Sequence, residues 1–78
     1  MGKSIAIISG QIWEVMYDKI EVYPLPPHVM ITIDLYIGDK FIIVANVEPN
    51  WSYNKISFWG VDVWIWSKTL IRHCKLIG

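Results

Sequence analysis

Apolar side chains occupy every second position from Val29 to Ile37, and this alternation constrains the fold more than any other feature of the sequence. A period of two is that of a β-strand with one face buried and the other exposed. The alternating apolar residues are Val29, Ile31, Ile33, Leu35 and Ile37. We therefore expect a strand from His28 to Ile37 whose isoleucine-rich face packs on the core.

A second strand, Lys40–Glu48, is predicted after the pair Gly38-Asp39. Two strands joined by a short connection that contains glycine indicate a β-hairpin. The run from Phe41 to Ala45 is apolar on both faces of this second strand. We expect such a strand to be covered on both sides.

The remainder of the chain is typical of further short strands, which we place at 3–8, 11–23, 55–59 and 61–66. Within 11–23 the apolar positions change parity around Asp18-Lys19. That change requires a bulge or a turn, because a shift of one residue exchanges the two faces of a strand. Gly60 lies at a second change of parity and predicts a bulge or a sharp bend. The prolines of 24–27 end the strand before them, because proline cannot donate a ladder hydrogen bond.

The segment Ser67–Gly78 has two interpretations. Leu70, Cys74 and Ile77 have the spacing of a short helix capped by Ser67, whereas β-branched residues such as Thr69 favour a strand, which is our prediction. The chain is thus predicted to be one β-rich domain over residues 1–78, all-β and mainly antiparallel. We expect a small barrel or sandwich of five to seven short strands, with a short C-terminal helix as the alternative for its end.

The composition predicts that part of the apolar surface is covered by another molecule. Hydrophobic residues make up 54% of the chain and charged residues 18%, against about 45–50% and about 25% in an average domain. The chain has 78 residues, and a domain of this size buries only about 60–65% of its unfolded surface. Self-association or an obligate partner would hide the excess.

Localisation follows from cysteine usage and from the length of the apolar runs. Cys74 is the single cysteine, so no intrachain disulfide can form and a reducing compartment is expected. No segment approaches the roughly 20 apolar residues of a membrane-spanning helix, and the N-terminus lacks the features of a signal peptide. We therefore expect a cytoplasmic protein that does not enter a membrane.

Charge and reactive groups exclude several functions. Seven Lys and Arg residues balance seven Asp and Glu residues, whereas nucleic-acid binding rests on an excess of cations. His73 and Cys74 are adjacent and would point to opposite faces of a strand, and with His28 they supply too few ligands for zinc. We therefore expect neither a metal site nor a cofactor nor an enzyme.

Aromatic residues are the distinctive chemical feature of the chain, which has five tryptophans and four tyrosines. Trp64 and Trp66 share a strand face with Asp62, opposite Val61, Val63 and Ile65, and either form an outer contact face or lie in a strand buried on both sides. Trp51 and Tyr53 fall in a predicted loop. The candidate protein-binding or dimer-interface residues are Trp64, Trp66, Asp62, Trp51, Tyr53, Tyr36 and Met30.

The leading functional hypothesis is a non-enzymatic protein that binds other proteins, as a homodimer or larger assembly and through contact with a host protein. In size and style the chain resembles the small accessory proteins of phages and other mobile elements. Many of those inhibit a host enzyme or a defence system such as restriction or CRISPR. This resemblance covers no motif and assigns no residue. The alternatives are an OB-like or SH3-like module that binds single-stranded nucleic acid through stacked tryptophans, and a carbohydrate-binding module.

Overall fold

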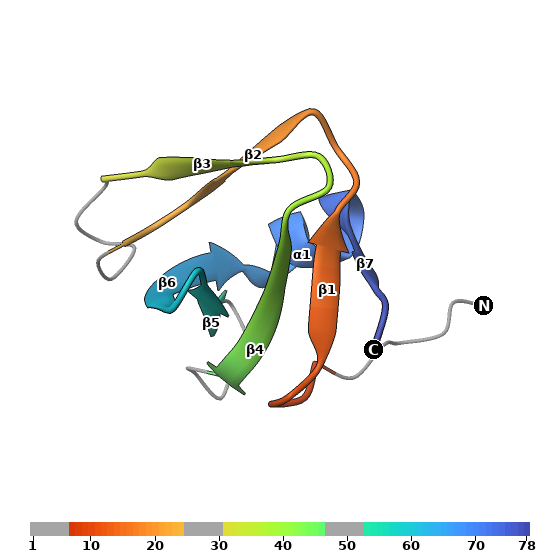
Figure 1. Cartoon of the computed structure of the whole chain (residues 1–78). Helices are drawn as coiled ribbons and strands as arrows, with labels where there is room; N and C mark the ends of the chain where they lie inside the picture. The colour runs from red at the N-terminus through yellow and green to blue at the C-terminus, as the bar shows by residue number, and fades with distance from the viewer. Residues whose placement is uncertain (1–6, 25–30, 47–52) are drawn as a thin grey trace.

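The computed structural model describes residues 7–24, 31–46 and 53–78 (Figure 1). These residues form seven strands and one short helix. In chain order the elements are β1 Ile12–Val15, β2 Lys19–Val22, β3 Ile33–Tyr36, β4 Lys40–Asn46, β5 Tyr53–Phe58, β6 Val61–Trp66, α1 Ser67–His73 and β7 Cys74–Leu76. Every pairing between these strands is antiparallel, which confirms the predicted fold class.

The strands form two sheets that enclose one core. A five-stranded sheet has the order β6-β5-β4-β1-β7, and β2 and β3 form a separate two-stranded ribbon. In Figure 1 the β2–β3 ribbon runs across the view above β5 and β6, whereas β1 and β4 run down it. Tyr23, just after β2, exchanges backbone hydrogen bonds of 2.8 and 2.7 Å with Trp64 at the outer edge of β6. This isolated bridge joins the two-stranded ribbon to the edge of the five-stranded sheet.

The two sheets meet at a corner where a single antiparallel ribbon bends. β1 pairs with β4 and β2 pairs with β3, in registers that differ by one residue. At the corner Gly38 N–H donates to the Val15 carbonyl at 2.9 Å, and Ile37 N–H donates to the Asp18 carbonyl at 3.3 Å. Val15 is buried before the corner and Ile20 after it. The corner therefore produces the change of parity predicted around Asp18-Lys19.

The predicted hairpin between 28–37 and 40–48 is wrong, because β3 and β4 pair with other strands. A turn does occur at Gly38, whose φ of +94° favours glycine, and the Asp39 carboxylate accepts a hydrogen bond from Tyr36 N–H at 2.8 Å. This turn carries the chain from one sheet to the other.

The expected burial of the isoleucine-rich face holds only for Leu35 among the described residues of 28–37. Ile33 is 39% and Ile37 60% exposed, because a two-stranded ribbon covers the core with only part of its length. In β4, Phe41 and Ile43 are buried while Ile42 and Val44 are exposed. The prediction that this strand is covered on both sides is therefore also wrong.

The C-terminal segment combines both interpretations of the sequence. Residues 67–73 form a helix, so the strand prediction is wrong there, and a strand follows at 74–76. Leu70 is fully buried, and its burial explains why a segment with β-branched residues is helical. Ser67 is the first helical residue rather than the cap, which is Trp66 without a side-chain hydrogen bond. The Ser67 hydroxyl instead accepts a hydrogen bond from the buried Asn54 side-chain amide at 3.0 Å.

The core contains side chains from every strand and from the helix. Its buried members are Trp13, Val15, Ile20, Val22, Leu35, Phe41, Ile43, Ile56, Val63, Ile65, Leu70 and Cys74. Because this apolar set is enclosed by one curved layer of strands, the outer faces of the same strands are left to solvent or to a partner.

Candidate protein-binding surface

From Asp62 to Trp66 the strand β6 has the parity predicted from the sequence, but Val61, predicted on the core face, is 56% exposed. Val63 and Ile65 are fully buried, whereas Asp62 is exposed and Trp64 is half-buried on the opposite face. Trp66, on the same outer face, is 36% exposed. The outer face of β6 therefore carries the indoles, as expected.

The indoles of this face pack against tyrosines of the same chain. The Tyr53 ring lies edge-on to Trp64 at 5.7 Å and to Trp66 at 5.3 Å between centroids. Trp66 also meets Tyr23 at 6.0 Å and donates its indole N–H to the Tyr23 hydroxyl at 3.0 Å. The Lys55 ammonium lies 5.2 Å from the centre of the Trp64 ring. We call these five residues the aromatic cluster; much of its apolar surface is already in contact.

The other predicted contact residues are placed differently. Tyr53 begins β5 and pairs with Trp66, so its assignment to a loop is wrong. Tyr36 is 54% exposed and lies opposite Lys19, at the corner end of the β2–β3 ribbon, whereas Tyr23 of the aromatic cluster follows the other end of β2. The structure thus brings Trp64, Trp66 and Tyr53 together but not Tyr36. Met30 and Trp51 lie outside the described residues.

The tip of the β5–β6 hairpin carries the most exposed large apolar side chain of the described residues, Trp59, at 86%. Trp59 and Gly60 form a two-residue turn and have φ angles of +54° and +77°. Two positive φ values are the signature of a type I′ turn, which favours Asn-Gly. The sharp bend predicted at Gly60 is confirmed, but the strand predicted through residue 59 ends at Phe58.

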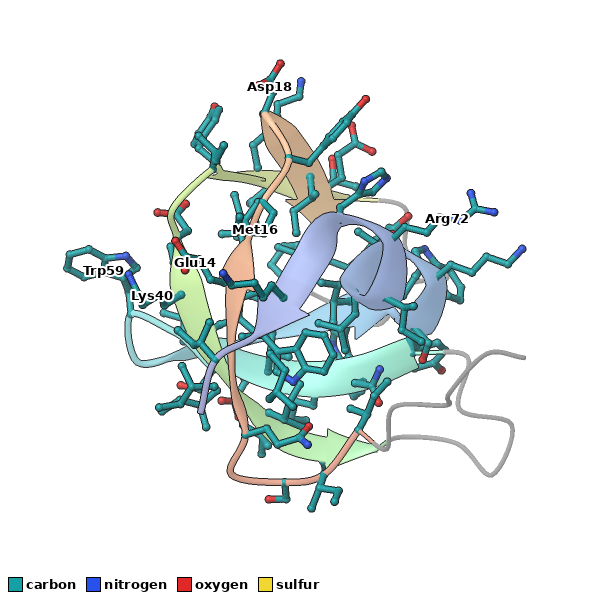
Figure 2. All side chains as sticks on the ribbon, turned by 90° about the vertical axis from the view of Figure 1, so that its right-hand side faces the viewer. Glu14, Met16, Asp18, Lys40, Trp59 and Arg72 are labelled. Atoms are coloured by element: carbon teal, nitrogen blue, oxygen red, sulfur yellow. The ribbon has the colours of Figure 1, made fainter. Side chains whose placement is uncertain are left out.

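A shallow pocket of about 330 Å³ adjoins this tryptophan. Its walls are the turn residues Gly38, Asp39 and Lys40 on one side and Phe58 and Trp59 on the other. The Phe58 and Trp59 rings are 6.2 Å apart and nearly perpendicular. Figure 2 shows the Trp59 indole projecting outward from the molecule, with Lys40 beside it.

The same region holds the next most exposed large apolar residues of the described chain. Ile37 is 60% exposed and directly precedes the pocket residue Gly38, and Val61 is 56% exposed and pairs with Phe58 across the hairpin. We call Ile37, Trp59, Val61 and the pocket walls the tip patch. None of the residues of the tip patch is among the contact residues predicted from the sequence. The sequence indicates this hairpin only by the two residues that separate two alternating segments. Tryptophan at the first turn position makes the hairpin hard to predict, because such turns favour Asn-Gly.

The described residues offer little reactive chemistry. Burial raises the pKa of the Cys74 thiol to about 12, so the thiol stays protonated and unreactive at neutral pH. No cluster of three or more potential metal ligands occurs in 7–24, 31–46 or 53–78. In those ranges no helix has the length and apolarity needed to span a membrane.

Comparison with known proteins gives no relative from which a function can be transferred. No family model, no curated protein and no solved structure matches this chain. The surface itself is therefore the basis for the functional argument.

Proposed function

We propose that the chain is a non-catalytic protein-binding domain whose contact surface is the tip patch. The observation that carries the proposal is Trp59, which is 86% exposed and has a φ of +54°. A left-handed conformation costs a residue other than glycine or asparagine about 1–2 kcal/mol. An indole that is 86% exposed gains almost no burial energy to offset this cost. Backbone outliers of this kind are concentrated at functional sites, and tryptophan is the residue type most enriched at interaction hot spots.

A protein fits this surface better than a nucleic acid does. Asp39 and Lys40 stand side by side at the pocket and have opposite charges, whereas a phosphate backbone requires a cluster of cations. Base or sugar stacking through the aromatic cluster would require free ring faces, and Trp64 already contacts Tyr53 and Lys55. The partners expected from the sequence, a second copy of the chain and a host enzyme or defence protein, both remain proposals.

Photo-crosslinking in cells tests the proposal directly. A photoreactive amino acid at Val61, beside Trp59, should form covalent adducts with protein, and Trp59→Asn in the same chain should remove them. The same probe at Glu21, an exposed residue of the β2–β3 ribbon, is the matched control and should give no adduct that depends on Trp59. Equal adducts with and without the Trp59 substitution would show that the contact surface lies elsewhere.

A further inference from the structure

We infer that the occupant of the tip patch is a second copy of this chain, related by a two-fold axis. Each Trp59 indole would enter the pocket of the other copy, between the Gly38–Lys40 turn and Phe58. This inference rests on the proposed function and gives its partner.

A projecting group and a recess lie next to each other at the tip of the β5–β6 hairpin. Trp59 projects from the hairpin, and the pocket of about 330 Å³ begins at its base. Because one water needs only about 10–15 Å³ in this measure of volume, the pocket has room for a group of many heavy atoms such as an indole. A two-fold interface uses the same patch on both copies, so a residue that inserts must have its receptor close by on the same surface.

The pocket also carries charges that two copies of the chain can pair with each other. The pocket wall carries Asp39 and Lys40 as neighbours. A two-fold axis that passes midway between these two residues would place Lys40 of each copy opposite Asp39 of the other, and two equivalent ion pairs would form. Within the described residues the ion pair present joins Lys19 and Asp34 at 3.9 Å, so Lys40 has no ion-pair partner of its own there.

Exposed apolar side chains near the hairpin tip also favour a second copy of the chain as the partner. Ile37, Trp59 and Val61 are the three most exposed large apolar side chains of the described residues. One contact between two copies at the hairpin tip would remove Trp59 and Val61 from water in each copy.

Sedimentation equilibrium across the micromolar range tests the inference. The wild-type chain should dimerise reversibly, and Trp59→Asn should weaken the dimer by at least about 30-fold, the effect of losing a hot-spot residue. Asparagine suits the turn, so this variant should fold. Lys40→Glu should also weaken the dimer, whereas the matched control Lys75→Glu should not. Both lysines lie opposite Glu14, but Lys75 is on β7, away from the tip.

Isotope-filtered NOEs between labelled and unlabelled chains test the geometry itself. They should join the Trp59 indole of one copy to Gly38 and Phe58 of the other. A wild-type chain that stays monomeric, a dimer unaffected by Trp59→Asn, or a dimer without these NOEs would each overturn the inference. Adducts from Val61 to a different protein that still require Trp59 would at the same time leave the proposed function standing.

Discussion

Replacement of Trp59 by asparagine should stabilise the fold while it removes the contact surface. The φ of +54° at this position costs a typical residue about 1–2 kcal/mol. Asparagine tolerates the left-handed region, and Asn-Gly is the preferred pair for a two-residue hairpin turn. The substitution also removes a stabilising contact, in which the edges of the Trp59 and Phe58 rings meet with their centroids 6.2 Å apart.

That contact contributes little, because an indole that is 86% exposed buries only a small part of its surface. We therefore expect a net stabilisation of about 0.5–1 kcal/mol. For a domain of this size, that free energy raises the melting temperature by about 2–8 °C.

Thermal and urea unfolding, followed by far-UV circular dichroism, measure this difference. Both proteins must be compared at a concentration low enough to keep them monomeric, because a dimer stabilises the native state by mass action. Trp59→Phe is the control: a phenyl ring in the same strained conformation should leave the stability nearly unchanged. If the monomeric asparagine variant is less stable than the wild type, then Trp59 is present for packing and the functional reasoning fails.

Two further perturbations test the packing of the core. Burial raises the pKa of the Cys74 thiol from its ordinary value of 9.0 to about 12. The unfolded state loses this proton first, so stability should fall between pH 9 and 12, by up to about 1.4 kcal/mol per pH unit. Urea unfolding over that range should show a weaker pH dependence in Cys74→Ala, and identical slopes would contradict the assigned burial. Asn54 is fully buried and donates to the Ser67 hydroxyl. Asn54→Asp should lower stability by about 3–5 kcal/mol at neutral pH, and more than Asn54→Ala does, because it buries a charge; equal losses would show that water reaches the site.

Hydrophobic periodicity predicted the buried face over part of the chain, because burial acts on single side chains and repeats with the strand period. The alternation from Val61 to Trp66 places Val63 and Ile65 in the core, and the change of parity near Asp18 corresponds to the corner between the two sheets. Periodicity does not report which strand lies beside which. The segments at 33–36 and 40–46 are neighbours in sequence with a turn between them, yet each pairs elsewhere. Their partners depend on contacts between distant segments.

Helix α1 shows the limit of local preference. Thr69 and Ile71 favour a strand, but residues 67–73 are helical because one turn places Leu70 in the core and returns the chain to β1 through β7. The Cys74 N–H donates to the Leu70 carbonyl at the end of the helix. Whether such a segment forms a helix or a strand depends on the space left between the strands, and the local sequence pattern does not encode that space.

The composition predicts an excess of exposed apolar surface. The exposed fractions of the tryptophans in the described residues show where part of that surface lies. Trp13 is 1% exposed and donates its indole N–H to Gln11, while Trp64 and Trp66 pack in the aromatic cluster. Trp59 alone among these is left almost wholly in water, in a backbone conformation that a smaller residue would adopt more easily. A turn that only needed to join β5 to β6 would be more stable with Asn-Gly. This comparison supports the proposal that the indole at the tip binds a molecule outside its own chain.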